Sequence, residues 1–317
     1  MGFSSKNYAY VEELLAKRRT ESEYRAQKNT EELYLRSPEV REIDRKLSGV
    51  GFALVRVAME KTDVAARIEA LKEENLALQA RRREILASLG LPANYTDVVP
   101  VCALCRDRGF TDHGMCSCMR QLLVEAGYRS SGLGNLLKKQ NFDNFSLHYY
   151  EGDALRYAER ALDVAKSFAE TFHQTGKNLL FMGGTGLGKT HLSTAIARRA
   201  IDRGFDVVYE TAQNVIADFE YDRFKSGYGE TETRADKYLD CDLLIMDDLG
   251  AELTNQFTVS SLYNILNTRI NLGKSTIVST NLGQKNLLER YDERITSRLF
   301  GEFDPILFRG RDIRGQK

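Results

Sequence analysis

The segment that most constrains this chain is a glycine-rich stretch between an apolar run and a run of helical periodicity. It reads G-G-T-G-L-G-K-T from residue 183 to residue 190, directly after the apolar residues 178–182. Glycines let backbone N–H groups converge on phosphates, and the start of the following helix adds positive potential there. The pattern therefore predicts a strand, a phosphate-binding loop and a helix, in that order. The nucleotide-binding residues that we expect are Gly183, Gly184, Thr185, Gly186, Leu187, Gly188, Lys189, Thr190 and His191.

Four polar side chains would supply the chemistry of this site. Lys189 would reach the β- and γ-phosphates of a nucleotide, and the hydroxyl of Thr190 would ligate Mg²⁺. A second apolar run, residues 243–246, leads into two adjacent acids, Asp247 and Asp248. Adjacent carboxylates at the end of a buried strand are unfavourable unless a metal or polar partners compensate them. We expect Asp247 to hold Mg²⁺ through bound water and Asp248 to orient and deprotonate an attacking water.

The pattern around these motifs predicts a parallel sheet. Apolar runs with the length of buried strands recur at residues 178–182, 207–209, 243–246 and 275–279. Stretches of helical periodicity separate them, which is typical of crossover units and an α/β fold. The fourth run ends just before Asn281, so this amide side chain would lie near the γ-phosphate.

Residues 1–95 have the pattern of helices. Ser37 and Pro38 indicate a break and the start of a second helix. Further on, apolar residues recur in alternating steps of four and three and form a seam, with Asn75 and Arg82 as its polar interruptions. The apolar members of the seam are Val64, Ile68, Leu71, Leu78, Ile85 and Leu89. This coiled-coil-like pattern predicts an antiparallel partner helix, which we expect from residues 8–36. The hairpin would be either a spacer between domains or a docking surface for another protein's helices.

Composition narrows the range of functions. The 317 residues include 45 Lys+Arg and 45 Asp+Glu, and a net charge of zero argues against a uniformly basic nucleic-acid coat while allowing a local basic groove. No apolar stretch approaches the ~18 residues that a membrane span needs, and the first residues lack a signal-peptide core. We therefore expect a cytoplasmic protein with no membrane contact.

Four of the five cysteines lie in a C-x2-C-x10-C-x-C pattern formed by Cys102, Cys105, Cys116 and Cys118. Two close pairs with glycines between them can place four thiolates in a tetrahedron around Zn²⁺. A short segment with few core-forming residues would gain its folding energy from the metal. His113 is an alternative fourth ligand, and redox-active thiols are the alternative to a metal site. Cys241, alone before the acidic strand, is expected to pack in the core.

Residues from about Phe142 to Arg314 resemble the AAA+ ATPases of the bacterial helicase-loader family (DnaC/DnaI type) and their relatives, the IstB transposition helpers. The resemblance rests on GGTGLGKTHL, LLIMDDLG, STN, DERITSRL and GRDIR. It implies an AAA+ P-loop domain with a parallel five-stranded sheet flanked by helices, after a helical coiled-coil-like arm and a small zinc-binding module. The domains would be a helicase-interaction arm at 1–95, a zinc module at 96–135 and an ATPase domain at 140–317.

The resemblance also implies roles for three residues. Arg298 looks like an arginine finger that acts in trans on a neighbouring copy of the chain, Asn281 like the first sensor and Arg314 like a second sensor at the phosphates. From the residues alone, Arg294 and Arg298 would share a helix face, where they would bind a common anion or pair with Glu289, Asp292 or Glu302. Asp248 stands where AAA+ proteins at large carry Glu, which suits a slow hydrolase used as a switch. A C-terminal helical lid is not expected.

In this family an insertion after the second strand binds single-stranded DNA. The corresponding stretch here, residues 214–238, interleaves aromatic and basic side chains, as base stacking and phosphate contact require. We expect Tyr221, Phe224 and Lys225 to contact DNA and Phe219 to pack in the helix core.

These features predict an ATP-dependent loader that delivers a replicative hexameric DNA helicase onto single-stranded DNA during replication initiation, with ATP, Mg²⁺ and Zn²⁺ as cofactors. An ATPase helper of a transposase acting on duplex DNA shares the ATPase motifs and is the alternative. The cysteine pattern and the helical arm favour the loader. A small-molecule P-loop kinase fits less well, because the sequence offers neither a lid nor arginines placed for an acceptor.

Overall fold

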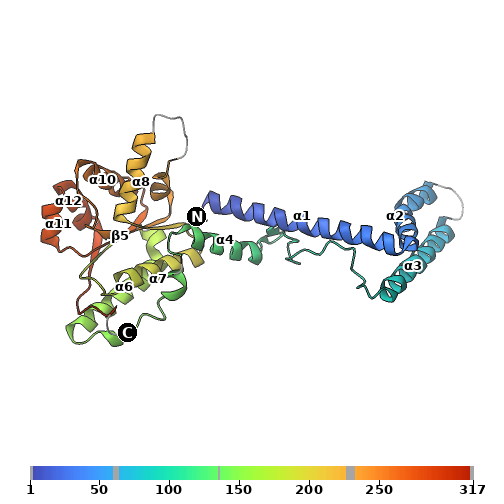
Figure 1. Ribbon diagram of the computed structural model, residues 1–317, viewed down its shortest axis with the longest axis horizontal. Coiled ribbons are helices and arrows are strands. Elements are labelled where there is room, and N and C mark those ends of the chain that lie inside the picture. Colours follow the sequence, from blue (N-terminus) through green and yellow to red (C-terminus); the bar gives the residue numbers. More distant parts are fainter. Residues whose placement is uncertain (1–2, 60–63, 135, 226–232, 315–317) are drawn as a thin grey trace. The chain divides into compact units, whose positions relative to one another are not determined.

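The structure, a computed structural model, describes residues 3–59, 64–134, 136–225 and 233–314, without the side chains of Lys138 and Lys225. The chain divides into two compact units (Figure 1). One unit is formed by Glu12–Cys116, and the other combines Met1–Val11 with Ser117–Lys317. The first long helix therefore contributes its first turns to one unit and the rest of its length to the other.

The Glu12–Cys116 unit is built mainly from helices. They are α1 (Ser5–Arg36), α2 (Pro38–Met59) and α3 (Val64–Ser88). Pro38 starts α2, as predicted, because its fixed φ suits the first turn of a helix and its missing N–H has no partner there anyway. A short antiparallel hairpin of β1 (Phe110–Thr111) and β2 (Gly114–Met115) follows.

The partner of α3 is α2, so the predicted pairing of α3 with residues 8–36 is wrong. Their shared core consists of Leu33, Val40, Ile43, Ile85 and Leu86, and only Leu33 in that set comes from α1. Pro38 turns the chain into a second helix that is close to α3 in sequence, and short connections favour antiparallel neighbours.

Arg82, which interrupts the apolar seam of α3, is compensated by a partner on α2. Its guanidinium donates to Asp44 Oδ1 at 2.7 Å and to Thr96 Oγ1 at 2.7 Å. The seam itself is buried only near its end, at Ile85, whereas Ile68 remains 38% exposed. The seam therefore makes a partial helix contact and not a continuous coiled coil.

In the second unit, five strands of the described residues form a parallel sheet, as predicted. They are β3 (Asn178–Met182), β4 (Val207–Thr211), β5 (Leu243–Leu249), β6 (Ser275–Thr280) and β7 (Phe303–Leu307). Their order is β4-β5-β6-β3-β7, and every adjacent pair is parallel. All five strands consequently end at one edge of the sheet.

Helices cover both faces of this sheet (Figure 1). On β3, Leu179 and Phe181 point into one core while Leu180 and Met182 point into the other, which is the alternation of a strand buried on both sides. The first core is completed by α6 (Asp153–Thr175) and α7 (Lys189–Asp202). The second is completed by α8 (Ala212–Lys225), α9 (Asp236–Asp240), α10 (Gln256–Asn271), α11 (Gln284–Arg290) and α12 (Glu293–Gly301).

Shorter elements connect the start of this unit to the sheet. They are α4 (Ser117–Ser130), α5 (Leu136–Lys139) and the 3₁₀ turn η1 (Leu147–Tyr149). The first residues of the chain pack on the same unit: Asn7 Nδ2 donates to Ser130 Oγ at 3.1 Å, and Arg129 donates to the Tyr10 hydroxyl at 2.7 Å.

Cys241 packs in the core, as predicted, and it lies beside a buried cation. Its side chain has no exposed surface, and Arg269, which is equally buried, donates to its sulfur at 3.4 Å. The same guanidinium donates to the carbonyls of Tyr238 and Ser275 at 2.8 and 2.7 Å. The buried charge is therefore hydrogen-bonded to backbone dipoles, which offsets part of its desolvation.

Across the described ranges, no helix combines the length and the apolarity needed to cross a membrane.

Candidate functional site

The glycine-rich loop follows β3 and leads into α7, so it lies at the edge where the strands end. A cavity of ≈ 450 Å³ opens over it. Residues of the loop and of the neighbouring strand ends line this cavity together: Thr185, Gly186, Leu187, Gly188, Lys189, Thr190, His191, Asp247, Asp248, Asn281 and Arg314. The structure thus brings together most of the residues that the sequence predicts for nucleotide binding. Gly183 and Gly184, also predicted, are not among the lining residues, and their carbonyl oxygens accept from Lys189.

Lys189 is buried and makes three short hydrogen bonds to neutral oxygens. Its ammonium group donates to Gly183 O at 2.6 Å, to Gly184 O at 2.8 Å and to Asn281 Oδ1 at 2.7 Å. An ammonium group has three donors, so its hydrogen-bonding capacity is used in full. Burial lowers the pKa of Lys189, and the nearby Asp247 and Asp248 carboxylates oppose that shift.

The Asp247 carboxylate lies between two strands and α7. Thr190 Oγ1 donates to Asp247 Oδ2 at 3.2 Å, and the hydroxyl of Tyr209 on β4 donates to the same oxygen. The other oxygen, Oδ1, accepts from Ser279 Oγ on β6 and from the Asp248 N–H at 3.1 Å. A carboxylate and a threonine hydroxyl are oxygen donors of the kind that Mg²⁺ prefers, so these two residues fit the ion.

Asp248 has an unusual backbone conformation at the end of β5. Its φ is 61°, in the left-handed region, and the pairing of β5 with β6 shifts register between Met246 and Leu249. A residue with a Cβ is disfavoured there, and such outliers concentrate at functional sites. The conformation points the Asp248 side chain at the cavity, where Asn281 Nδ2 donates to its Oδ1 at 2.7 Å.

The C-terminal segment crosses the glycine-rich loop. Phe308 N–H donates to Met182 O at 2.7 Å, and Ile313 N–H donates to Gly186 O at 3.1 Å. A Cβ on Gly186 would lie 1.8 Å from Asp312 Oδ1 and would displace that side chain, and the φ of Gly186, 74°, itself favours glycine. The segment places Arg314 in the cavity lining and an acid, Asp312, beside the loop.

His191, expected at the nucleotide, faces a polar segment that precedes α6. Its Nε2 lies 2.9 Å from Asn141 O and 3.0 Å from Asn144 Oδ1. The hydroxyl of Tyr150 also fixes the loop, by donating to Leu187 O at 3.0 Å. His191 therefore has a second role, which is to hold the segment before α6 against the loop.

Arg294 and Arg298 have separate partners and do not converge on one anion. Arg294 pairs with Asp292 at 3.1 Å, and its guanidinium lies 5.6 Å from the centre of the Tyr263 ring. Arg298 donates to Asn267 Oδ1 at 2.8 Å and lies 3.9 Å from Glu302 Oε1. Within the described residues, neither arginine lines the cavity over the loop.

The predicted DNA-binding residues lie at the end of α8. Phe224 is 76% exposed, and Tyr221 lies under the Arg234 guanidinium, 3.7 Å from the centre of its ring. The side chain of Lys225 lies outside the described part of the structure. Phe219 packs against the second core and stacks on Tyr238, as expected of a core residue.

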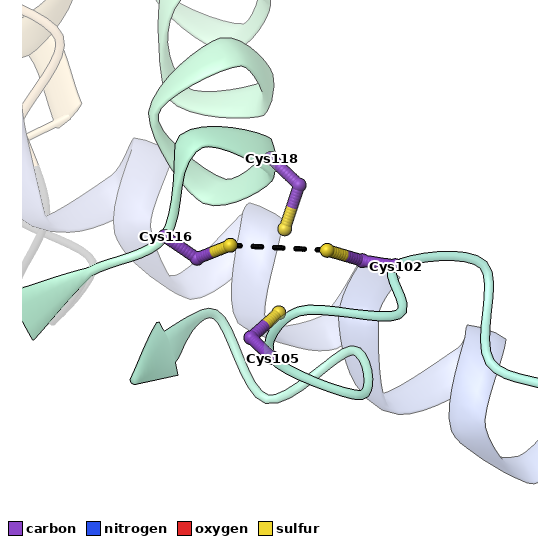
Figure 2. A group of neighbouring side chains, drawn as sticks. All are labelled: Cys102, Cys105, Cys116 and Cys118. Atoms are coloured by element: carbon purple, nitrogen blue, oxygen red, sulfur yellow. Dashed lines mark hydrogen bonds between the residues drawn. The ribbon is translucent and has the colours of Figure 1, made fainter. Parts of the chain in front are cut away.

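The four cysteines of the spaced pattern form one cluster. Figure 2 shows Cys102, Cys105, Cys116 and Cys118 pointing toward one another, and their sulfur atoms all lie within 4.8 Å of one another. The sulfurs of Cys102 and Cys116 are 3.8 Å apart. Four sulfurs bound at about 2.3 Å to a tetrahedral ion are ~3.8 Å apart. The cluster could therefore hold a metal ion with little rearrangement.

Backbone groups and a buried acid hold the first cysteine pair in place. Gly109 N–H donates to Cys105 Sγ at 3.4 Å. The fully buried Asp107 accepts from the N–H groups of Val101 and Cys102 at 2.7 and 3.0 Å. His113 lies exposed between β1 and β2, and the ligand cluster found among the described residues does not include it.

Sequence reasoning missed three contributors to the site over the loop. Tyr209 belongs to no motif, and only the strand order of the folded sheet places it beside the acidic strand. Ser279 was recognised only as the end of an apolar run. Asp312 stands in the GRDIR tail, where the resemblance drew attention to Arg314 alone.

The fold and the site together define a P-loop ATPase of the AAA+ class. A family model described as IstB-like ATP binding protein matches residues 139–299, and the chain belongs to this family. Among curated proteins, an uncharacterized protein of Escherichia coli K12, YdaV, is 30% identical over 182 residues, or 57% of this chain and 69% of that protein. The replicative helicase loader DnaC of the same strain is 23% identical over 180 residues, or 57% and 71% of the two chains. The crystal structure of the DnaC helicase loader covers 55% of this chain and 98% of its own, with 23% identity and a TM-score of 0.48.

Proposed function

We propose that the protein is a cytoplasmic ATP-dependent loader that delivers a replicative DNA helicase onto single-stranded DNA. The observation that carries this proposal is the similarity to the helicase loader DnaC. The glycine-rich loop, Lys189 and Asp247, which line one cavity, support it. ATP binding and slow hydrolysis would act as a switch, because nucleotide states shift an equilibrium only when they favour different conformations or partners.

In this proposal several residues that line the cavity at the glycine-rich loop have defined roles in ATP binding or hydrolysis. The loop N–H groups and Lys189 bind the phosphates, and Arg314 acts on them from the C-terminal segment. Thr190 and Asp247 hold Mg²⁺, which supplies charge neutralisation at the phosphates when bound. Asp248 takes a proton from the attacking water, and Asn281 orients the acid. The hydrogen bonds from Asn281 to Asp248 and from Lys189 to Asn281 support this division.

Hydrolysis would also depend on a second copy of the chain. Arg298 acts in trans as an arginine finger, and its absence from the described lining of its own cavity supports this role. Its hydrogen bond to Asn267 then holds the guanidinium in place on α12 until a neighbouring nucleotide site is present.

The helical arm would contact the helicase. Phe52, Val55 and Met59 on α2 are 84%, 57% and 80% exposed, and steps of three and four place them on one face of the helix. Large apolar side chains gathered on one exposed face are typical of protein-docking surfaces. We assign this set, the α2 apolar face, to the helicase.

The cysteine cluster would bind one Zn²⁺ through four thiolates. The 3.8 Å separation of two sulfurs and the N–H donor to Cys105 support this assignment. The ion would stabilise a segment that otherwise has few buried apolar side chains.

Single-stranded DNA would contact the end of α8. The exposed Phe224 ring is suited to stack on a base, and Tyr221 and Lys225 flank it in sequence. Binding of this kind depends on stacking and on phosphate contacts, and it weakens with salt.

The decisive experiment is reconstitution with the cognate hexameric helicase. We expect the full chain to co-purify with the helicase and to load it onto circular single-stranded DNA only with ATP. A Lys189→Ala variant is expected to bind the helicase but fail to load it. Absence of any interaction with the helicase in the ATP, ADP and nucleotide-free states would refute the proposal.

A transposase helper is the second candidate, because the matching family model is that of the IstB-like proteins. That match is confined to residues 139–299 and so excludes the helical arm and the cysteine cluster. The two candidates differ in their DNA: a strong preference for duplex over single strands in the reconstitution would favour the transposase helper.

A further inference from the structure

Tyr209 makes a contact with the acidic strand that the proposed mechanism does not use. Its hydroxyl donates to Asp247 Oδ2, the oxygen that also accepts from Thr190 at 3.2 Å. The ring is 8% exposed and packs in the first core. A phenol hydroxyl is protonated at neutral pH, and a carboxylate only accepts, so the hydroxyl of Tyr209 is the donor in this bond.

The backbone of Tyr209 is held from outside the sheet. β4 is an edge strand, and its unpaired side is covered by the segment that follows α4, where Ser131 O accepts from Tyr209 N–H at 2.8 Å. A Cβ on Gly132 would lie 2.4 Å from Tyr209 O, so this close approach requires glycine. The ring is thus fixed by the core and its backbone by this segment.

The Asp247 carboxylate has four donors, two on each oxygen. Tyr209 and Thr190 donate to Oδ2, and Ser279 and the Asp248 N–H donate to Oδ1. A carboxylate offers about four acceptor positions, so all of them are occupied. Thr190 belongs to the phosphate loop and would turn to the metal, which opens one position on Oδ2. Tyr209 is then the remaining side-chain donor on that oxygen.

We propose that Tyr209 is a positioning residue for the magnesium site, which holds the Asp247 carboxylate in the orientation that receives the ion. Tyr209 on β4 donates to one carboxylate oxygen and Ser279 on β6 donates to the other. These two hydrogen bonds fix the plane of the carboxylate before the nucleotide binds. This assignment rests on the proposed magnesium role of Asp247. Residues that orient metal-binding carboxylates typically contribute 10–100-fold to affinity or activity.

A second buried tyrosine of the same unit provides a matched control. The hydroxyl of Tyr238 donates to Asp218 Oδ2 at 2.6 Å, and its side chain has no exposed surface. Tyr238→Phe therefore removes the same kind of hydrogen bond from the same unit, at a carboxylate that does not line the cavity over the loop. Any effect of hydroxyl loss on folding alone is expected in both variants.

The experiment measures binding of a fluorescent ATP analogue to the full chain in EDTA and across a Mg²⁺ titration. For Tyr209→Phe we expect unchanged affinity in EDTA and about a 10-fold rise in the Mg²⁺ concentration that gives half of the magnesium effect. Ser279→Ala is expected to shift the titration in the same direction, and Tyr238→Phe to leave it at the wild-type value. Tyr209→Leu, a second variant without the hydroxyl, replaces Tyr209→Phe if circular dichroism shows that the latter is unfolded.

Each outcome has a defined meaning. A wild-type magnesium titration for Tyr209→Phe, a tighter one, or an equal shift in Tyr238→Phe would overturn the assignment. The Asp247→Asn variant tests the proposed magnesium role of Asp247 separately from the role of Tyr209. If Asp247→Asn loses the magnesium response while Tyr209→Phe keeps it, only the role of Tyr209 is wrong. If Asp247→Asn keeps the response, the magnesium role of Asp247 fails and the role of Tyr209 fails with it.

Discussion

Asn281 donates from its amide nitrogen to Asp248 Oδ1 at 2.7 Å, and its amide oxygen accepts from Lys189 at 2.7 Å. One side chain at the end of β6 thereby connects the cation of the phosphate loop to the acid assigned to the attacking water. Because a single planar amide makes both hydrogen bonds, a displacement of the Lys189 ammonium group can move the Asp248 carboxylate without a change in the fold.

Replacing Asn281 with Ala should therefore separate binding from hydrolysis. We expect ATP affinity to remain close to that of the wild type, since the loop and Lys189 remain, while the hydrolysis rate falls about 10²-fold, as for the loss of one preorganised polar group at a reacting centre. Steady-state hydrolysis and analogue binding measure the two effects. Asn264→Ala, an exposed asparagine on α10, is the control. Equal losses of affinity and rate would contradict the assignment.

The role of Arg298 can be tested by mixing. Arg298→Ala is expected to bind ATP normally and to lose about 10³-fold or more in assembly-dependent hydrolysis, since an arginine finger stabilises charge in the transition state. A catalytically inactive Lys189→Ala protein, which retains Arg298, should restore activity when it is mixed with the Arg298→Ala protein. Arg294→Ala, which removes the ion pair with Asp292, is the control. We expect this variant to hydrolyse ATP without the added Lys189→Ala protein. Failure of the mixture to recover activity would argue against action in trans.

The cysteine cluster should bind one zinc ion per chain. Cys102→Ser is expected to lose the metal and to lower the stability of the unit that contains residues 12–116, since metal binding supplies folding energy. His113→Ala should retain the full metal content, because its side chain does not belong to the cluster. Elemental analysis of purified protein, with thermal unfolding in the presence of a chelator, measures both. Loss of zinc in His113→Ala would indicate a site with three cysteines and one histidine.

Substitutions at two exposed aromatic residues should affect DNA binding and helicase binding independently. Phe224→Ala is expected to weaken single-strand binding by about 1–3 kcal/mol, the contribution of one stacked base, and to leave helicase affinity unchanged. Phe52→Ala, on the α2 apolar face, should have the opposite effects. Fluorescence anisotropy with an oligonucleotide and a pull-down with the helicase measure the two affinities. Parallel losses in both assays for either variant would contradict the division.

Stability should depend on pH through Asp206, the residue before β4. Burial, and then Asp242, raise the pKa of Asp206 from 3.8 to about 6. The folded state therefore binds more protons than the unfolded state between these values, and stability falls as pH rises through that window. Asp206→Asn should raise the free energy of unfolding at pH 7 by on the order of 2 kcal/mol and flatten its dependence between these pKa values. Denaturant unfolding at several pH values measures this, with the exposed Asp304→Asn as control. A flat wild-type profile would contradict it.

The sequence predicted the sheet well because local patterns determine its parts. Each of the four predicted strands is a short apolar run, and each is buried on both faces. The phosphate loop was equally clear, since its glycines and its position after β3 are local features. The partner of α3 was predicted wrongly, because an apolar seam shows that a helix has a neighbour but does not identify it.

The rest of the site depends on contacts between distant segments. Tyr209 reaches Asp247 only because β4 lies beside β5, and Asp312 reaches Gly186 only because the chain returns after β7. Neither contact has a signature in the residues nearby. For Arg294 and Arg298 the alternative of pairing with nearby acids is confirmed at Asp292 and Glu302. The amide of Asn267 was missed, since helical spacing does not specify which side chain of another helix lies opposite.

The packing of Asn7 and Tyr10 against the end of α4 has a practical consequence for truncation experiments. A fragment that begins after residue 95 discards these side chains and leaves Ser130 and Arg129 without the groups they bond to. Such a fragment would lack part of the surface of the nucleotide-binding unit, so a loss of activity could not be ascribed to the missing arm. An internal deletion that keeps residues 1–11 and joins them to residue 117 through a flexible linker is the fairer comparison.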